Sequence, residues 1–175
     1  ASILLAGPML ARFGKVTLPP PGGDVIGRRR VDTHFLALEA LGAEVDVGGE
    51  YSLEAKHLVG ADIFLDEPSV TGTENALMAA VAAKGRTVFR NAAAEPHVQD
   101  LARFLVAMGA SIEGIGSNMY VVEGGRPLQG ARHTIGPDHI EIGSFIGLAA
   151  VTGGNLVIDG VRGEDLRATL LGFDR

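Results

Sequence analysis

The chain has 175 residues, 46% of them hydrophobic and 21% charged, which is enough to build one globular domain or two small ones. It contains no Cys, which excludes disulfides, thiolate metal sites and a thiol nucleophile. Lys and Arg number 15 against 21 Asp and Glu, and the net charge of −6 opposes general binding to nucleic acid or anionic membranes.

Three segments show the same order of elements, an apolar helix followed by a glycine and a short strand. Glycine just after a helix favours a left-handed cap, and the β-branched runs that follow are typical of buried strands. We therefore expect three helix–strand pairs, over 2–18, 73–90 and 140–158, with helices ending at Gly14, Gly85 and Gly153–Gly154.

A second module follows each of the first two pairs. The helix–glycine–strand phrase of 35–45 recurs at 105–112, with equivalent positions 67 residues apart. Each copy continues into an expected hairpin and then a closing strand; the hairpins span 46–56 and 113–123, and the closing strands 62–65 and 133–135. The repeat is thus α-β-α-β-β-β, and the third copy stops inside its second helix, at 166–173.

This repeat predicts the domain organisation. Residues 1–135 hold two units, 1–66 and 67–135, and 136–175 begin a further unit of a second domain. Because the chain does not start with Met and stops within a unit, we expect a piece of a longer polypeptide, the alternative being a small protein of two and a half units. No run of 18 uncharged apolar residues is present and the start lacks a basic leader, so we expect a cytoplasmic protein.

The long loop of the first copy, 19–32, carries the most distinctive chemistry. It begins with three prolines, places Asp24 between glycines, and continues into Arg28, Arg29 and Arg30. A carboxyl held near arginines can exchange a proton with a bound anion, and the arginines can form a fork for phosphate or carboxylate. The alternative is a solvated surface loop stiffened by proline and turned by glycine.

The junction at 68–75 offers hydroxyls and free backbone N–H groups at the start of a helix, which favours an anion. Simple capping by Thr71 or Thr73 is compatible with that function, and Asp32 or Thr33 can cap the preceding helix in the same way. Pro96 is expected to be the first residue of a helix, and helix capping is the expected role of the neighbouring residues Glu95, His97 and Asp100.

No His, Asp and Glu cluster has metal-ligand spacing, and the dinucleotide, P-loop and nucleophile-elbow motifs are absent from the sequence. We therefore expect no metal and no cofactor.

The sequence contains several distinctive ungapped motifs, which are Gly7 to Gly14, Pro21 to Arg29, Val31 to His34, Leu41 to Ala43, Pro68 to Val70, Thr73 to Asn75, Asn91 to Ala93, Glu95–Pro96, Pro137–Asp138 and Ile140–Glu141. These motifs resemble those of the UDP-N-acetylglucosamine enolpyruvyl transferases. The likeness extends along essentially the whole chain and corresponds to the middle portion of such an enzyme.

The resemblance implies an α/β fold, an inside-out α/β barrel built from repeated βαβαββ units. It also implies transfer of enolpyruvyl from phosphoenolpyruvate to the 3-hydroxyl of UDP-N-acetylglucosamine, with release of phosphate, as the first committed step of peptidoglycan synthesis. The implied partners are these two small molecules and the remainder of the polypeptide. The alternative is a non-catalytic repeat-barrel module that binds a nucleotide sugar.

By position, Asp24 matches the family's general acid, which protonates the methylene carbon of phosphoenolpyruvate and is Cys in most members. The Asp form is expected to resist fosfomycin, an epoxide that alkylates the thiol. Arg29 matches a substrate-clamping arginine. The remaining substrate-binding positions carried over from the family are Arg30, Val31, Asp32, Thr33, Glu67, Pro68, Ser69 and Val70.

The chain departs from the family pattern at a few positions. Arg30 stands where Pro is usual, Thr33 where Leu is common, Thr71–Gly72 where Gly-Ala is usual, and His139 in place of Arg. The family's N-terminal Lys-Asn pair and the Asp and Arg residues of its second half have no counterpart in these 175 residues. We therefore expect the chain alone to be inactive.

Overall fold

The computed structural model describes residues 2–20, 22 and 30–174. The chain divides into two compact bodies, Ala1–His133 and Thr134–Arg175, here called the N-terminal and C-terminal bodies. All the described residues of the predicted site lie in the N-terminal body.

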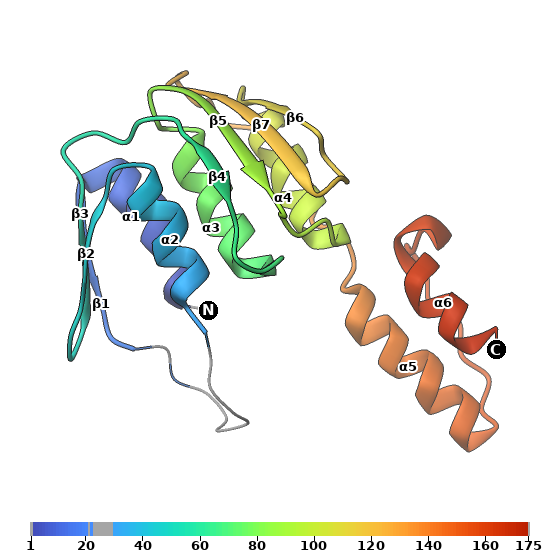
Figure 1. Ribbon diagram of the computed structural model, residues 1–175. Coiled ribbons are helices and arrows are strands. Elements are labelled where there is room, and N and C mark those ends of the chain that lie inside the picture. The colour runs from blue at the N-terminus through green and yellow to red at the C-terminus, as the bar shows by residue number, and fades with distance from the viewer. Residues whose placement is uncertain (1, 21, 23–29, 175) are drawn as a thin grey trace. The chain divides into compact units, whose positions relative to one another are not determined.

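The first sheet of the N-terminal body is antiparallel and has the order β1-β3-β2 (Figure 1). Its repeat contains the 3-10 helix η1 (Ser2–Leu5), α1 (Ala6–Phe13), β1 (Lys15–Leu18), α2 (Asp32–Ala40), β2 (Glu44–Val47) and β3 (Tyr51–Glu54). The expected strand over 15–18 and the expected hairpin within 46–56 are confirmed, although β2 already begins at Glu44.

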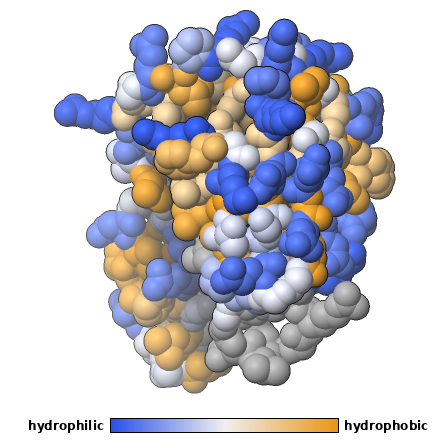
Figure 2. Space-filling model, turned by 90° about the vertical axis from the view of Figure 1, so that its left-hand side faces the viewer, coloured by the Kyte–Doolittle hydropathy of each residue, from blue (hydrophilic) through white to orange (hydrophobic). Residues whose placement is uncertain are grey.

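Side chains alternate across this sheet. Val16, Leu53 and Val45 occupy matching register positions and face the helices, while Lys15 and Glu54 pair on the outer face. This alternation is typical of an antiparallel sheet with one solvated face. Figure 2 views the molecule from the side on which the sheet lies in Figure 1, and hydrophilic residues are interspersed there with hydrophobic ones.

The second sheet has the order β4-β5-β7-β6, and β4 is parallel to β5. Its elements are β4 (Asp62–Phe64), α3 (Val70–Ala80), β5 (Gly85–Arg90), α4 (Pro96–Ala107), β6 (Ser111–Glu113) and β7 (Met119–Gly124). The closing strand of the first repeat is therefore an edge strand of the second sheet. The expected hairpin over 113–123 is confirmed, since β6 and β7 pair antiparallel and the Ser117 N–H donates a bond of 2.9 Å to the Gly114 carbonyl in the turn between them.

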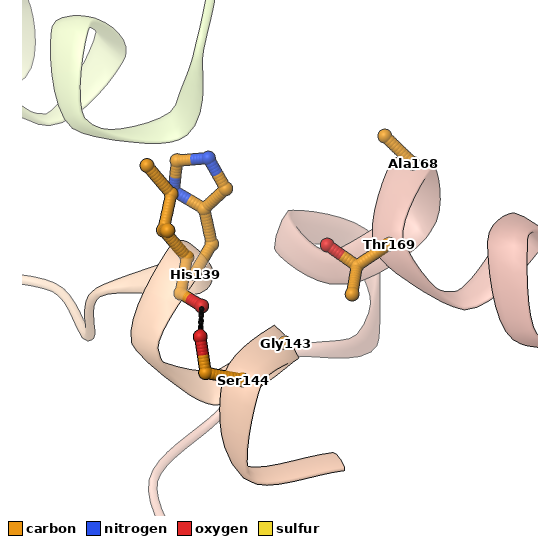
Figure 3. A pocket seen from close by; sticks show the side chains of 6 residues that line it. His139, Gly143, Ser144, Ala168 and Thr169 are labelled. Carbon is orange, nitrogen blue, oxygen red and sulfur yellow. Dashed lines mark hydrogen bonds between the residues drawn. The ribbon is translucent and has the colours of Figure 1, made fainter. Parts of the chain in front are cut away.

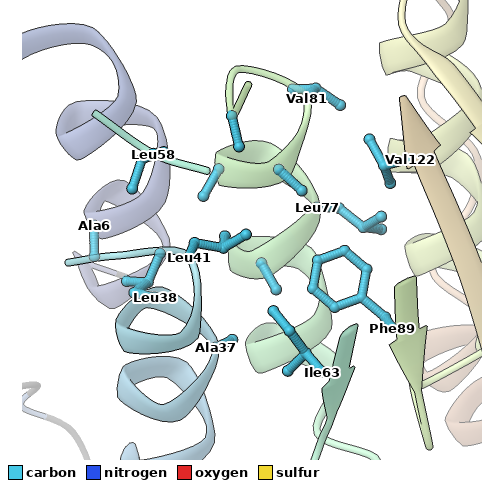
Figure 4. Close-up of a cluster of buried hydrophobic side chains, with 14 of the residues drawn as sticks. Ala6, Ala37, Leu38, Leu41, Leu58, Ile63, Leu77, Val81, Phe89 and Val122 are labelled. Carbon is cyan, nitrogen blue, oxygen red and sulfur yellow. The ribbon is translucent and has the colours of Figure 1, made fainter. Parts of the chain in front are cut away.

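Helix α3 joins the two repeats. It contacts α1, α2 and α4, and its buried residues form a broad face, while Thr71 on the opposite side is exposed and Glu74 and Met78 are half-buried. Figure 4 shows Leu77 of α3 facing Phe89 and Val122 of the second sheet, while Leu38 and Leu41 approach α3 from the side of α2. One apolar core thus spans both sheets.

Close contact between α1 and α3 requires a glycine. A Cβ at Gly7 would lie 2.5 Å from the backbone oxygen and from Oδ1 of Asn75, so a larger residue would push the helices apart. The Gly7 N–H instead donates a bond of 2.6 Å to Asn75 Oδ1.

Two of the three predicted helix ends are confirmed. Gly14 and Gly153 adopt left-handed conformations just after α1 and α5, as expected for glycine caps. The expectation that Gly85 ends the second helix is wrong, because α3 ends at Ala80 and Gly85 is the first residue of β5.

The C-terminal body consists of α5 (His139–Thr152), η2 (Gly163–Leu166) and α6 (Arg167–Phe173). The strands expected at 133–135 and 155–158 are wrong, since neither segment is extended into a ladder in the described structure. Their counterparts 62–65 and 86–90 pair with each other as β4 and β5, so each of these strands depends on the other.

Candidate functional site

The predicted site residues fall into three groups. Asp24, Arg28 and Arg29 lie outside the described residues. Residues 30–33 lead into α2, and residues 67–70 connect β4 to α3. Hydrogen bonds join these last two segments, which lie at the same end of the helices in Figure 1.

Arg30 is surrounded by carboxylates. Its Nη2 lies 2.6 Å from Oδ2 of Asp66, its Nε 3.3 Å from Oδ2 of Asp32, and its Nη1 3.4 Å from Oε2 of Glu67. These groups raise the pKa of Arg30, first through the hydrogen bond to Asp32 and then through Asp66. The guanidinium is thus already engaged by acids of this chain.

Thr33 forms the second link between the segments. Its side chain is buried, and its hydroxyl donates a bond of 2.6 Å to Oδ1 of Asp66. This hydrogen bond is the main cause that lowers the pKa of Asp66, and Arg30 adds to it. Both carboxylate oxygens of Asp66 are therefore occupied by residues that precede it by more than thirty positions.

The net charge of this cluster decides what it can bind. One guanidinium faces three carboxylates, so the cluster formed by Arg30, Asp32, Asp66 and Glu67 carries a net charge of −2. A phosphate would be repelled here, whereas hydroxyl and N–H groups would find acceptors. Among the described residues, this cluster suits a neutral group with hydroxyl or N–H donors better than an anion.

The caps of the two helices differ from the predicted ones. Ser69, not Thr71 or Thr73, is the N-cap of α3, and its Oγ accepts a bond of 3.2 Å from the Gly72 N–H. Val31 occupies the N-cap position of α2, so the expected capping by Asp32 or Thr33 is wrong. Asp32 is the first residue of α2, where its charge complements the helix dipole.

A buried polar network lies next to this acidic cluster. Asn75 Oδ1 accepts from Gly7, so its amide nitrogen faces the carbonyl of Ile3 at 2.9 Å and Nδ1 of His34 at 3.0 Å. Nδ1 of His34 must then accept, and Nε2 carries the proton toward Thr71 Oγ1 at 3.1 Å. Burial lowers the pKa of His34 to about 4, so this imidazole is neutral at pH 7.

Beside the acidic cluster lies a hollow of about 570 Å³ between α2 and the first sheet. Phe35 and Tyr51 meet edge to face in its wall, with ring centroids 5.1 Å apart. The lining residues are Val31, Asp32, Phe35, Leu36, Glu39, Val45, Val47, Tyr51 and Asp66. Asp32 and Asp66 thus face both the cluster and this hollow.

The residues around Pro96 form a separate set. Pro96 is the first residue of α4, as predicted, and Glu95 is its N-cap without a side-chain capping bond. Oε2 of Glu95 is buried and has no hydrogen-bond partner among the described residues. Asp100 instead contacts Nε2 of His133 at 3.2 Å, and the His133 ring stacks on Phe104.

The C-terminal body contains its own hollow of about 530 Å³, between α5 and the start of α6 (Figure 3). His139 and Ser144 of α5 and Thr169 of α6 are among the residues that line it. Ser144 donates to the carbonyl of Ile140 at 3.1 Å, and none of the predicted site residues that the structure describes lines this hollow. Asp138 caps α5 by accepting from the N–H groups of Ile140 and Glu141.

Within the described residues, no group of three or more His, Cys, Asp or Glu side chains is arranged to hold a metal ion. None of the described helices is long and apolar enough to cross a membrane.

Sequence reasoning missed Asp66, His34 and Asn75. Asp66 directly precedes a predicted site residue and follows a predicted strand, which could have drawn attention to it. His34 and Asn75 belong to recognisable motifs, but their contact spans 41 positions and has no local signal.

The described structure is an α/β protein with one antiparallel sheet, one mixed sheet and two copies of one helix–strand arrangement. A family model described as EPSP synthase (3-phosphoshikimate 1-carboxyvinyltransferase) matches residues 1–172, so the chain belongs to that family.

Curated relatives with high sequence identity include UDP-N-acetylglucosamine 1-carboxyvinyltransferases. The UDP-N-acetylglucosamine 1-carboxyvinyltransferases of Bradyrhizobium diazoefficiens and Treponema denticola are 64% and 60% identical over all 175 residues. The chain spans 41% of the length of each of these relatives. The resemblance read from the sequence motifs is thereby confirmed.

Solved structures support the fold. The enolpyruvyl transferase NikO from Streptomyces tendae matches with a TM-score of 0.67 at 22% identity, covering 83% of this chain and 35% of that one. EPSP synthase from Acinetobacter baumannii matches with a TM-score of 0.65 at 23% identity, covering 86% and 34%. At these identities the likeness concerns the fold alone.

Proposed function

We propose that this chain is part of a longer cytoplasmic enzyme that transfers enolpyruvyl from phosphoenolpyruvate to the 3-hydroxyl of UDP-N-acetylglucosamine, in the first committed step of peptidoglycan synthesis. The observation that carries the proposal is the 64% identity, along the whole chain, to a UDP-N-acetylglucosamine 1-carboxyvinyltransferase. We further propose that the complete fold is the inside-out barrel implied by the resemblance, with 1–135 in one domain and 136–175 beginning the next.

In this proposal Asp24 is the general acid. It gives a proton to the methylene carbon of phosphoenolpyruvate, while the sugar 3-hydroxyl oxygen bonds to the adjacent carbon and loses its own proton to water or to a base of the complete polypeptide. Because the product retains the enol double bond, that methyl carbon must lose a proton again as the phosphate leaves. A carboxyl can perform both transfers, and it is a poor target for the epoxide of fosfomycin, so we expect resistance to that compound.

Arg29 is proposed to clamp an anionic substrate, and the two described segments are proposed to hold UDP-N-acetylglucosamine. These segments comprise Arg30, Val31, Asp32 and Thr33 on one side and Glu67, Pro68, Ser69 and Val70 on the other. Their support is that hydrogen bonds bring the segments together, and that the acid excess there offers acceptors to hydroxyl and N–H groups.

The first test measures phosphate release from phosphoenolpyruvate by the complete polypeptide that contains this chain. We expect release that depends on UDP-N-acetylglucosamine, and release without the sugar nucleotide would contradict the assignment. Asp24→Asn should abolish turnover while sugar-nucleotide binding stays within about tenfold, because only the proton donor is lost. Asp46→Asn, at an exposed position on β2, is the matched control.

The second test concerns Arg29. Arg29→Ala should weaken substrate capture by roughly 2–4 kcal/mol if the guanidinium clamps a desolvated anion. An unchanged KM and kcat would remove Arg29 from the site.

A second candidate function is a non-catalytic nucleotide-sugar-binding module, favoured by the acid excess of the cluster formed by Arg30, Asp32, Asp66 and Glu67, which offers acceptors to hydroxyl and N–H groups. Assay of the complete polypeptide that contains this chain separates the two. A non-catalytic module would bind UDP-N-acetylglucosamine saturably without consuming phosphoenolpyruvate, whereas the proposed transferase consumes phosphoenolpyruvate when the sugar nucleotide is present.

A further inference from the structure

We propose that Asp66 is a positioning residue that holds Arg30 and Thr33 in place at one wall of the sugar-nucleotide site. The inference rests on the proposed function for the identity of the ligand. It concerns a residue outside the set that the sequence motifs indicate.

The first argument is the use of both carboxylate oxygens. Oδ2 of Asp66 lies 2.6 Å from Nη2 of Arg30, and Oδ1 lies 2.6 Å from the hydroxyl of Thr33. Charge-assisted bonds of this length are stronger than neutral ones. A single side chain therefore fixes two residues of the opposite segment in one orientation.

The second argument is that Asp66 stands on a firmly held part of the backbone. The preceding residue, Leu65, is fully buried and its N–H donates to the carbonyl of Arg90 at 3.0 Å. The side-chain amide of Asn91 donates to the Leu65 carbonyl at 2.9 Å. Because both backbone groups of Leu65 are bound to the end of β5, Asp66 can act as an anchor.

The third argument is that the opposite segment needs such an anchor. The N-cap position of α2 is occupied by Val31, whose side chain cannot accept from the free N–H groups of the first turn. Thr33 directs its hydroxyl to Asp66 rather than to its own helix. The start of α2 is thus tied to the β4–α3 junction instead of being capped locally.

The expected effect is on binding geometry more than on overall stability. The side chains of Arg30 and Asp66 are 45% and 33% exposed, and ion pairs at such exposed positions contribute little to folding because solvent screens them. Loss of the anchor would leave the fold intact but would free Arg30 and Thr33 to move. Substrate affinity should then fall while the chemical step stays nearly unchanged.

The test is Asp66→Asn in the complete polypeptide, since the substitution keeps the shape and removes the charge. We expect KM for UDP-N-acetylglucosamine to rise about tenfold and kcat to stay within about twofold, with an unfolding temperature close to that of the wild type. Asp62→Asn is the matched control, because Asp62, at the start of the strand that precedes Asp66, forms an exposed pair with Arg90 at 2.9 and 3.0 Å. It should leave KM unchanged.

Hydrogen exchange in the ligand-free polypeptide gives a second readout that does not depend on the ligand's identity. Asp66→Asn should accelerate exchange of the backbone amides of 32–35, and Asp62→Asn should not. In a background of Arg30→Met with Thr33→Val, the Asp66 substitution should have little further effect on KM, because its partners are gone.

An unchanged KM for Asp66→Asn in an active polypeptide overturns the inference and leaves the proposed function standing. An equal rise of KM for Asp62→Asn overturns it as well, since a general charge effect would then suffice. If the wild type does not use UDP-N-acetylglucosamine, the proposed function fails and with it the stated ligand. Hydrogen exchange of the amides of 32–35 in Asp66→Asn then decides separately whether Asp66 anchors Arg30 and Thr33. Exchange faster than in the wild type supports the anchor, and unchanged exchange refutes it.

Discussion

Acidification should destabilise the N-terminal body through one buried side chain, His34. Its Nδ1 accepts from the amide of Asn75 and its Nε2 donates to Thr71, so both ring nitrogens are committed in the neutral form. A second ring proton would place an N–H against the Asn75 amide hydrogens. The orientation of that amide is set by Gly7 and Ile3, so it cannot turn over without losing two bonds.

The magnitude follows from the pKa. The unfolded chain takes up the proton near the ordinary value of 6.5, whereas burial delays uptake in the folded protein to about pH 4. Between these values the unfolded state binds more protons, so the free energy of unfolding decreases as the pH falls. The contribution of neutral His34 to the free energy of unfolding is complete above pH 6.5, and about 3 kcal/mol of it is lost by pH 4.

The direct assay is NMR of the ¹⁵N-labelled histidine rings in the polypeptide that contains this chain. We expect His34 to keep the Nε2-protonated tautomer down to pH 5 and to titrate near pH 4. His34→Gln should remove about 3 kcal/mol of the difference in unfolding free energy between pH 7 and pH 4. The exposed His57, replaced by Gln, serves as the control.

A His34 titration midpoint near 6.5, or a proton on Nδ1, would refute this reasoning. Equal changes in the pH dependence of unfolding for His34→Gln and His57→Gln would refute it as well, because the effect would then not depend on burial.

Three further substitutions probe packing and burial. Burial raises the pKa of Glu74, which means that stability falls as the pH rises above 4.5; Glu74→Gln should therefore raise the unfolding temperature at pH 7 and flatten its pH dependence. Gly7→Ala would force a Cβ to 2.5 Å from Asn75 and should cost about 3 kcal/mol in chemical denaturation, whereas Gly49→Ala, with nothing within 4 Å, should be nearly neutral. Leu77→Ala should cost about 2–5 kcal/mol at this fully buried position, and a value below about 1 kcal/mol would show that Leu77 does not pack as described.

The regular elements could be predicted because their signals are local. The strand over 15–18 has alternating side chains and follows a glycine cap, and the repeat of 67 positions correctly placed the second helix–glycine–strand phrase and the hairpin after it. Amino-acid composition and the spacing of hydrophobic residues indicate these helices and strands without reference to any long-range contact.

The helix caps could not be settled in this way. Ser69, Thr71 and Thr73 lie within five positions, and each has a hydroxyl that can cap a helix. Ser69 is the N-cap of α3 because the chain turns there, and the Ser69 N–H donates to the carbonyl of Glu67 at 2.8 Å. Thr73 directs its hydroxyl to Ser69 and accepts from Ala93, a contact that only the folded chain creates.

The third repeat shows a related limit of predicting strands from sequence pattern. Residues 133–135 and 155–158 have the same local pattern as β4 and β5, yet the described structure contains no ladder there. His133 instead contacts Asp100 and Phe104 of α4. A strand is defined by its hydrogen-bonded partner, and a sequence pattern cannot show whether that partner is in place.

Two of the departures from the family pattern meet in space, and this leads to a last prediction. A Cβ at Gly72 would lie 3.1 Å from Cγ2 of Thr33 and 3.0 Å from the side chain of Ser69, so the β-branched methyl of Thr33 fills the space that alanine would need. Leucine, common in the family at position 33, carries no such methyl on Cβ, which is compatible with alanine at position 72.

Gly72→Ala alone should therefore destabilise the protein by about 1 kcal/mol, measured by chemical denaturation. In a Thr33→Ser background, which removes the methyl and keeps the hydroxyl bonded to Asp66, the same substitution should cost about 0.5 kcal/mol less. Strictly additive effects would show that the contact with Ser69 alone limits position 72. A coupling of the expected sign would instead show that Thr33 and Gly72 are adapted to each other, because only the shared methyl contact differs between the two backgrounds.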